Sequence, residues 1–485
     1  MIKQILLPGA DENSWDVYRD PLETLVASSP DEVLPVLRRV EEQVEARGLI
    51  AAGFVSYEAA AGFDNQMVTH RHTQLPLILF GLFASPQCQS RSSTIIGSAP
   101  ADHLGDQEFW RLESSAKDHA AKLARIHALI GSGTVYQINH TQRLRGRLQN
   151  PWALVQRAVA QAPQGAYIDT NDFTIVSASP ETFFSLEGDS IVSRPMKGTA
   201  ARSSDQDADQ AMGKWLASST KNRAENLMIT DMVRNDLGRI AEPGSVGVTD
   251  LFTLEKHPTV WQMTSGVRAQ TQVPVSEIFR HLFPAASITG APKHQAMSEI
   301  AKLEDSPREV YTGAIGFIAP GRRAHFNIAI RTAWLDKRTG LAEYGAGGGI
   351  VWDSKPGEEY QELLSKTKIL HNVCTADDFG LFETMAWVAG HGVQHQAEHL
   401  ARMAASARYF SLPFDSADAV RVLEEISNEL ASASQAQNKV RVRLDLHERG
   451  RFSVNADPAP ISKVDLAQPV ALAQTPVASS DPLLQ

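Results

Sequence analysis

Cysteine is nearly absent from this sequence, and its scarcity excludes several kinds of protein. The 485 residues include two cysteines, Cys88 and Cys374, which lie far apart along the chain. So few cysteines exclude a disulfide framework and a CxxC metal site. Proteins of a reducing compartment have this composition, so we expect a cytoplasmic protein.

Long apolar runs and dense basic clusters are absent as well. The longest apolar run, residues 76–84, contains Gly81 and reaches about half the length of a membrane span. Residues 5–7 are apolar, but Pro8 ends a run that is far too short for a signal peptide. The formal net charge is -10, without the basic density that nucleic-acid binding requires. The sequence therefore predicts neither a membrane nor a nucleic-acid partner, although an acidic protein can have a positive site for a small anion.

What is present is typical of a globular protein with more than one domain. Apolar residues make up 43% and charged residues 21%. A chain of 485 residues exceeds one ordinary core, so we expect two or three domains. A periodic apolar pattern that begins at Pro30 predicts a helix, residues 49–57 and 75–83 predict strands, and residues 109–130 predict a second helix.

Lys197 lies in the most distinctive stretch, Ser193–Thr199 (SRPMKGT). Pro195 fixes one backbone dihedral before the lysine, and Gly198 tolerates conformations that other residues cannot adopt. An amine held in this way, if desolvated or placed beside other cations, can lose its proton and act as a nucleophile. On this heptapeptide alone, a turn with a solvated lysine at its tip is the simpler interpretation.

Glu181 follows Pro180 between two apolar stretches, residues 173–176 and 182–186. These stretches predict a strand pair, so the carboxylate between them is expected to be partly desolvated. Desolvation raises the pKa of a carboxyl group toward that of a useful general acid. A glutamate on an edge strand is the alternative interpretation.

Glu359 and Glu362 are spaced i, i+3 on a predicted helix, which places both carboxylates on one face. Two like charges at this spacing repel unless a cation compensates them, and oxygen ligands suit Mg²⁺. An exposed acidic helix is the alternative. A further helix is predicted from Lys221, with Glu225 on its solvated side and an apolar face formed by Ala224, Leu227, Met228 and Met232.

Taken in order, these blocks resemble the chorismate-utilising enzymes, which include anthranilate, isochorismate and aminodeoxychorismate synthases. The resemblance covers residues 105–373 and rests on the blocks 178–181, 193–199, 223–228, 345–350 and 358–362. Lysine in the Pro-Met-Lys-Gly-Thr position is similar to component I of the aminodeoxychorismate synthases. Anthranilate synthases typically have alanine there.

The resemblance implies an α+β fold, an antiparallel β-sandwich with outer helices like that of anthranilate synthase component I. Residues 1–104 would form the N-terminal part of this fold, and residues 105–373 the chorismate-binding catalytic domain. It also implies a transferase of the transaminase class, which aminates chorismate at C4 to 4-amino-4-deoxychorismate, a precursor of 4-aminobenzoate and folate.

The resemblance also assigns roles to residues. Lys197 would attack C2 of chorismate while Glu181 helps the C4 hydroxyl to leave. Magnesium coordination falls to Glu225, Glu359 and Glu362. Tyr311 and Arg331, on or beside predicted strands, would contact the substrate. The other residues expected to contact it are Thr289, Lys366 and the backbone amides of Gly347, Gly348 and Gly349.

Two residues differ from those of related enzymes, and the differences disfavour particular reactions. Gln137 stands where isochorismate synthases have a lysine that activates water, and a neutral amide cannot be that base. Gln262 aligns with a histidine of the anthranilate synthases, and in those enzymes the histidine is associated with the loss of pyruvate. Its absence favours a synthase that stops before that elimination. Lys293 begins a predicted helix, where a surface lysine is the simplest interpretation, and Arg234–Asp236 are predicted to form caps and ion pairs.

Two other functions stay open at this point. The first is anthranilate synthase component I, and the second is a non-catalytic scaffold that binds an amidotransferase. Neither Cys88 nor Cys374 has the strand-to-helix context of a glutaminase nucleophile. A separate glutamine amidotransferase subunit is therefore the expected source of ammonia.

Residues 374–485 resemble the first half of class IV pyridoxal-phosphate enzymes, of the aminodeoxychorismate lyase kind. The stretches 379–385 and 399–403 carry the resemblance, and Arg402 would match the phosphate-binding arginine. The lysines of this segment, Lys439 and Lys463, do not occupy the family position of the Schiff-base lysine. We therefore expect a truncated segment without bound pyridoxal phosphate and without lyase activity.

Overall fold

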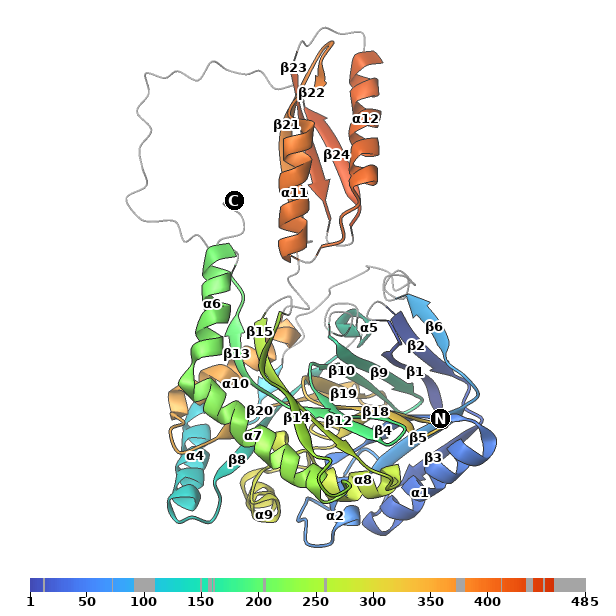
Figure 1. Cartoon of the computed structure of the whole chain (residues 1–485), viewed down its shortest axis with the longest axis vertical. Coiled ribbons are helices and arrows are strands. Elements are labelled where there is room, and N and C mark those ends of the chain that lie inside the picture. The colour runs from blue at the N-terminus through green and yellow to red at the C-terminus, as the bar shows by residue number, and fades with distance from the viewer. Residues whose placement is uncertain are drawn as a thin grey trace. The chain divides into compact units, whose positions relative to one another are not determined.

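A computed structural model (Figure 1) describes residues 1–11, 14–71, 73–90, 110–148, 151–155, 159, 162–203, 206–256, 260–371, 380–410, 412–432, 439–447 and 450–457. The chain divides into two compact units, residues 1–200, 214–256 and 261–374, and residues 201–213, 257–260 and 375–485. The predicted domain boundaries near residues 104 and 374 lie outside the described residues. Every helix among the described residues is too short or too polar to cross a membrane.

The first unit contains two ten-stranded sheets. The first sheet has the order β16 (Gly290–Ala291), β8 (Gln137–Arg147), β20 (Leu341–Ile350), β19 (Thr332–Asp336), β10 (Phe173–Ser179), β9 (Gln164–Thr170), β1 (Ile2–Pro8), β2 (Ser14–Arg19) and β6 (Gln87–Ser90), with β7 (Arg111–Leu112) beside β8. The antiparallel register of β8 and β20 pairs Asn139 with Gly349 and His140 with Gly348.

The second sheet begins at β13, which carries the SRPMKGT lysine. Its order is β13 (Met196–Ala201), β15 (Val260–Gln270), β12 (Ser190–Arg194), β11 (Thr182–Glu187), β18 (Arg323–Ile328), β17 (Ala314–Ala319), β4 (Ile50–Val55), β5 (Ile78–Phe83) and β3 (Glu23–Ala27), with β14 (Gly247–Lys256) beside β15. The almost wholly apolar β5 is buried along its whole length, as its sequence predicts.

The two sheets pack face to face, and their inner side chains form one core. Ile5, Ile168 and Trp334 of the first sheet meet Phe54 and Ile315 of the second. Alternation along each strand places these residues inside, so both sheets bury one face against the other. The predicted antiparallel sandwich is confirmed.

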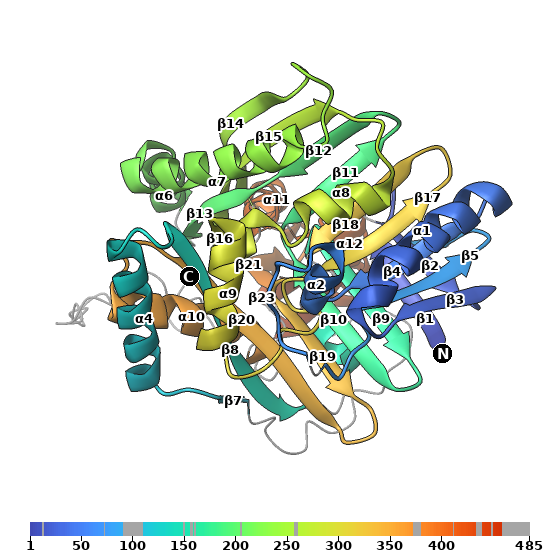
Figure 2. The same ribbon diagram turned by 90° about the horizontal axis from the view of Figure 1, so that it is seen from below.

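Helices cover the outer faces of the sandwich. They are α1 (Pro30–Arg47), α2 (Ala60–Phe63), α4 (Ala116–Gly131), α5 (Pro151–Leu154), α7 (Thr220–Gly238), α8 (Val275–Leu282), α9 (Lys293–Leu303) and α10 (Pro356–His371), with the 3₁₀ turns η1 (Tyr57–Ala59) and η3 (Ala286–Ile288). A further helix, α6 (Gln206–Ser218), belongs to the second unit up to residue 213 and to the first unit from residue 214. In Figure 2, α1, α2, α8 and α9 lie along one side of the sandwich. Buried residues of α1 and α8 share a core with the second sheet.

Capping residues at both ends of α1 explain why the helix begins where the sequence predicts. The Glu32 carboxylate accepts a hydrogen bond from the backbone N–H of Ser29 at 3.2 Å, and Pro30 occupies the first turn. Gly48 ends the helix in the left-handed region, with φ of 65°.

Three predictions about the elements are wrong. The strands β1, β2 and β3 precede α1 and had not been predicted. The second helix begins at Ala116 rather than near residue 109, because Ser115 and Asp118 form a capping box. Residues 173–179 and 182–187 are strands, but β10 lies in the first sheet and β11 in the second, so they are not a pair.

The second unit contains a four-stranded sheet with two helices. The strand order is β22 (Gly392–Val393), β21 (Leu381–Val388), β23 (Lys439–Leu446) and β24 (Phe452–Asp457), and the helices are α11 (Gln396–Phe410) and α12 (Ser416–Ser432). Trp387, Val442 and Leu444 of the sheet pack with Met403 and Leu423 of the helices. This unit is α+β, as its sequence predicts.

Candidate active site

Lys197 lies on β13, and its backbone is held on both sides by buried amide side chains. Asn226 Nδ2 of α7 donates to the carbonyl oxygen of Lys197 at 3.3 Å, and Gln262 Nε2 of β15 donates to that of Gly198 at 2.8 Å. Gly198 has a φ of 92°, which residues with a side chain rarely adopt. The conformation around the lysine is therefore set by its neighbours and by the glycine.

The amine of Lys197 extends to the first sheet at Gly349. A Cβ atom added to Gly349 would lie 3.3 Å from Lys197 Nζ and 2.7 Å from Gln137 Nε2. Gln137 Nε2 is buried and has no hydrogen-bond partner among the described residues. The glycine thus opens a space where a lysine from one sheet meets an amide from the other.

Glu181 occupies the crossing between β10 of the first sheet and β11 of the second. Its residue exposure is 5%, and Ser287 Oγ donates to its Oε1 at 2.9 Å. Burial raises the pKa of Glu181 to about 7, while hydrogen bonds from Ser287 and the Met196 amide and the charge of Lys197 limit the rise. A carboxyl group with this pKa can both give and take a proton near neutral pH.

The carboxylates of α10 face Gly348 of β20. A Cβ atom added to Gly348 would lie 3.5 Å from Glu359 Oε2, 3.8 Å from Glu362 Oε1 and 3.7 Å from Lys366 Nζ. Lys366 Nζ pairs with Glu362 Oε1 at 2.8 Å and donates to the carbonyl oxygen of Gly347 at 2.7 Å. The charge of Lys366 lowers the pKa of Glu362, whereas burial raises the pKa of Glu359.

Glu225 approaches this cluster from α7. Lys221, one turn before it, has its Nζ 4.0 Å from Glu225 Oε1, and its charge also lowers the pKa of Glu359 and of Glu362. The three carboxylates thus share one neighbouring cation. β13, β20, α7 and α10 are labelled close together in Figure 1.

Glu359 and Glu362 are the carboxylates that would hold a magnesium ion together with waters and oxygens of a bound molecule. Within the part of the chain that the structure describes, no group of three or more His, Cys, Asp or Glu side chains could hold a metal ion by itself. Mg²⁺ is usually bound through one or two carboxylates together with waters and substrate oxygens. Glu359 and Glu362 supply hard oxygen donors, and Glu362 adds to the rise in the pKa of Glu359, a repulsion that a divalent cation would relieve.

Two predicted substrate contacts, Tyr311 and Arg331, lie near the strand β20. The ring of Tyr311 packs against Gly345, where a Cβ atom would lie 2.3 Å from it. Arg331 lies between β18 and β19 and has a φ of 51°. Burial raises the pKa of the Tyr344 hydroxyl, and the positive charge of Arg331 opposes that rise. Thr289 is different, because its hydroxyl donates to the carbonyl oxygen of Ala285 at 3.0 Å and so stays within its own turn.

Two predictions about which helical residues are buried are wrong. Ala224 and Leu227 are exposed, and Leu227 keeps 51% of its surface exposed, because α7 buries polar Asn226 and Thr230 instead. The burial of Asn226 has a cause, since its amide bonds the backbones of Lys197 and Met263.

Lys293 is the second correction, because it is not a surface lysine. Its side chain is 11% exposed, and its Nζ pairs with Asp236 Oδ2 at 2.8 Å and donates to the carbonyl oxygen of Leu282 at 3.0 Å. Burial lowers the pKa of Lys293. The predicted ion-pairing role of Asp236 is confirmed.

Asn226 and Ser287 are the site residues that sequence reasoning missed. Asn226 lies in a quoted block, directly after Glu225, and Ser287 lies in the small-residue stretch before Thr289. A polar residue among apolar neighbours at a helical position was the available signal for Asn226. Ser287 gave no comparable signal, because its partner Glu181 is distant in sequence.

In the second unit, Arg402 contacts an acidic residue. Its Nε donates to Glu383 Oε1 at 2.7 Å, and His399 Nδ1 lies 2.7 Å from Glu383 Oε2. Lys439 is exposed at the start of β23, and Lys463 lies outside the described residues.

Comparison with known proteins identifies the families that the two units resemble. Residues 3–372 match the family described as chorismate binding enzyme, and residues 380–482 match amino-transferase class IV. Aminodeoxychorismate synthase component 1 of Klebsiella aerogenes is 40% identical over 273 residues, which cover 54% of this chain and 59% of that protein. Anthranilate synthase component 1 of Aquifex aeolicus (strain VF5) is 33% identical over 270 residues, which cover 55% of this chain and 54% of that protein. The chain thus spans less than two thirds of the length of these relatives.

A solved structure shows the same fold. The crystal structure of anthranilate synthase component I from Streptococcus pneumoniae TIGR4 superposes with a TM-score of 0.64 at 23% identity, over 75% of this chain and 92% of that chain.

Proposed function

The chain belongs to the chorismate binding enzyme family, and from this premise we propose that it aminates chorismate at C4 to give 4-amino-4-deoxychorismate. One observation carries the proposal, namely that the amine of Lys197 reaches Gly349 beside a buried glutamate whose pKa is about 7. The 40% identity to an aminodeoxychorismate synthase component 1 supports it. The product would be a precursor of 4-aminobenzoate and folate.

The proposed reaction has two steps: Lys197 first displaces the C4 hydroxyl, and ammonia then displaces Lys197. The Lys197 amine adds to C2, the ring double bond shifts, and the C4 hydroxyl leaves as water with the proton of Glu181. Ammonia then adds to C4, the double bond returns, and Lys197 leaves C2 as a neutral amine. The Glu181 carboxylate takes the proton of the new ammonium group, so the enzyme ends as it began.

Substrate binding would use the surrounding groups. Arg331 and Tyr311, with the amides of residues 347–349, would hold the carboxylate of the enolpyruvyl arm, because a guanidinium forms two parallel hydrogen bonds with a carboxylate. Lys366 would line the same pocket, whereas the Thr289 hydroxyl stays bonded within its own turn. Magnesium held by Glu359, Glu362 and Glu225 would neutralise the ring carboxylate.

The ammonia would come from a separate glutamine amidotransferase subunit. The name component 1 of the relative at 40% identity supports a partner component. Ammonium salts should replace that subunit, whereas glutamine alone should give no product with this chain.

Product identification tests the proposed function. Chorismate, Mg²⁺ and ammonium chloride are incubated with the chain, and products are separated and identified by mass. We expect 4-amino-4-deoxychorismate, lost when EDTA removes the metal. Fluorescent anthranilate would instead identify the alternative favoured by the Aquifex relative, and unchanged chorismate would indicate a scaffold.

A further inference from the structure

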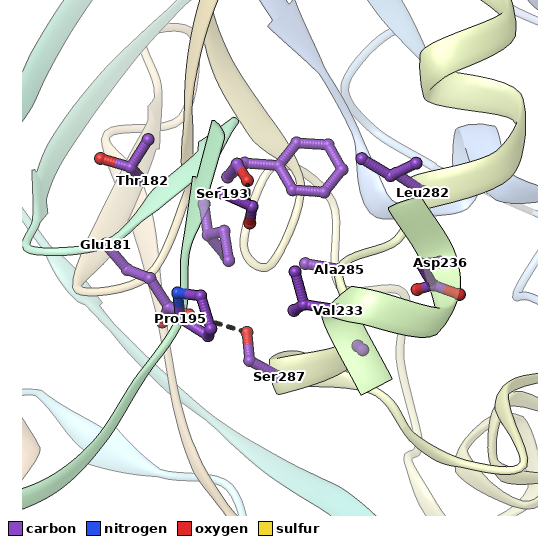
Figure 3. Close-up of a pocket in the computed structure, with 12 residues that line it drawn as sticks. Glu181, Thr182, Ser193, Pro195, Val233, Asp236, Leu282, Ala285 and Ser287 are labelled. Carbon is purple, nitrogen blue, oxygen red and sulfur yellow. Dashed lines mark hydrogen bonds between the residues drawn. The ribbon is translucent and has the colours of Figure 1, made fainter. Parts of the chain in front are cut away.

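A small cavity lies beside Glu181 and is too small for the substrate. Its volume is about 20 Å³, whereas a single water needs about 10–15 Å³. The lining residues come from β11, β12, β18, α7, α8 and η3 and the chain next to them: Glu181, Thr182, Phe183, Ser193, Pro195, Val233, Asp236, Leu282, Ala285, Ala286, Ser287 and Ile328. Figure 3 shows Val233 and Ala285 between Ser287 and Asp236.

The polar groups of this cavity already have partners for their own protons. Ser287 Oγ donates to Glu181, as the dashed line in Figure 3 shows, and Ser193 Oγ donates to the carbonyl oxygen of Phe183 at 2.7 Å. The two hydroxyl oxygens retain lone pairs, so they can accept from a guest. A guest that donates several hydrogen bonds is therefore favoured.

While Glu181 is protonated, the charges of the cavity favour a neutral guest over a cation, and once Glu181 is ionised its carboxylate can accept a hydrogen bond from that guest. The Asp236 carboxylate is compensated by the buried Lys293 at 2.8 Å. Most of the remaining wall is apolar, and burying an unpaired charge against such a wall is unfavourable. Ammonia has the size of water, is neutral, and donates up to three hydrogen bonds.

We propose that this cavity binds the amine nucleophile as neutral ammonia, next to Glu181, before it adds to C4. The inference rests on the proposed amination and adds to it where the nucleophile waits. From the cavity, the ammonia lone pair would form the bond to C4 as the bond between Lys197 and C2 breaks. The proton released from the new ammonium group passes to the adjacent Glu181 carboxylate.

Val233→Ile tests the site, because it adds one methylene to the wall from α7. Val233 takes no part in the chemistry, and its side chain lines the cavity. One extra methylene in a fitted pocket changes binding by about tenfold or more. We expect the KM for ammonia to rise about tenfold with the KM for chorismate unchanged. Val248→Ile, at an exposed position of β14, is the matched control and should leave both constants unchanged.

Val233→Ala gives a second readout that does not depend on how well the larger side chain is accommodated. Enlarging the cavity should allow methylamine to act as nucleophile, giving an N-methylated product that mass spectrometry detects and that the unchanged chain does not form. An unaltered KM for ammonia in Val233→Ile, a parallel rise in the KM for chorismate, or equal use of methylamine by both chains would overturn the inference. Absence of any amination by the unchanged chain would instead overturn the proposed function.

Discussion

The amine of Lys197 can reach the first sheet because residue 349 has no side chain. Its own backbone is restrained by Asn226 and Gln262, so the lysine has little freedom except along its stem. Glu181 reaches the same region from the crossing between the sheets, where burial favours its protonated form. In the proposed reaction, the pair would combine a positioned nucleophile with an acid that is active near neutral pH.

Replacing Lys197 should abolish the covalent step. We expect Lys197→Ala to reduce amination with free ammonium by roughly 10³-fold or more, because Lys197 supplies the amine at Gly349. Chorismate consumption followed by chromatography measures this. Lys214→Ala removes an exposed lysine of α6 and serves as the control. Undiminished turnover of Lys197→Ala with ammonium would refute the nucleophilic role.

Glu181 should give the rate a pH dependence near neutrality. Its raised pKa means that the carboxyl is protonated below about pH 7 and ionised above it. Departure of the hydroxyl needs the protonated form, so the rate at constant free ammonia should fall as pH rises through about 7. Glu181→Gln should lose this pH dependence and about 10²–10⁴-fold of the rate.

Ser287→Ala refines the same measurement. The Ser287 hydroxyl stabilises the ionised carboxylate, so its removal should raise the pKa of Glu181 and move the fall in rate to higher pH. A pH profile that is identical in all three proteins would show that another group titrates.

At the scale of elements, periodicity predicts the helices and strands better than their partners. The helix α1 follows from its apolar period and caps, and β5 follows from its apolar run. The partners of β10 and β11 could not be predicted, because nothing local reveals that the chain changes sheets at Pro180. The face of α7 was misjudged because Asn226 is buried by long-range hydrogen bonds rather than by hydrophobicity.

Substitutions at two glycines of β20 should have different effects, because one should reduce stability and the other activity. A Cβ atom at residue 347 would lie 2.3 Å from the carbonyl oxygen of His140, so Gly347→Ala should force strands apart and destabilise the fold by about 1–3 kcal/mol. At residue 349 the nearest groups are the flexible ends of Gln137 and Lys197.

Gly349→Ala should therefore retain nearly the normal melting temperature but displace the Lys197 amine. A displacement of about 1 Å can reduce a rate by about 10²-fold. Thermal unfolding and amination rates are measured on both variants. Equal loss of stability in the two, or normal activity of Gly349→Ala, contradicts the prediction.

The buried ion pair of Lys293 and Asp236 should join α9 to α7. Each side chain is 11% exposed, so removal of one partner leaves an uncompensated buried charge. We expect Lys293→Met to lower the free energy of unfolding by about 3–5 kcal/mol. The double variant Lys293→Met, Asp236→Leu should recover much of this loss. Denaturant unfolding measures both, and additive losses would show that the pair is not coupled.

At the scale of the whole molecule, the sandwich gathers groups that the sequence separates widely. Lys197 comes from the second sheet, Gly348 and Gly349 from the first, and the carboxylates from α7 and α10. The motif order predicts that these groups belong together, but their distances depend on how two sheets pack, which no local pattern encodes. The small cavity beside Glu181 could not be predicted for the same reason, since its walls come from six elements.

The class IV segment should lack lyase activity, because neither of its lysines occupies the position at which that family forms its Schiff base. Lys439 is exposed at the start of β23, and Arg402, which the resemblance would match to the phosphate-binding arginine, pairs with Glu383 at 2.7 Å. Incubation of the chain with pyridoxal phosphate and borohydride should leave its mass unchanged, and added 4-amino-4-deoxychorismate should release no pyruvate. A complete class IV lyase in the same assay is the positive control, and pyruvate release that depends on pyridoxal phosphate would show that another lysine serves as the anchor.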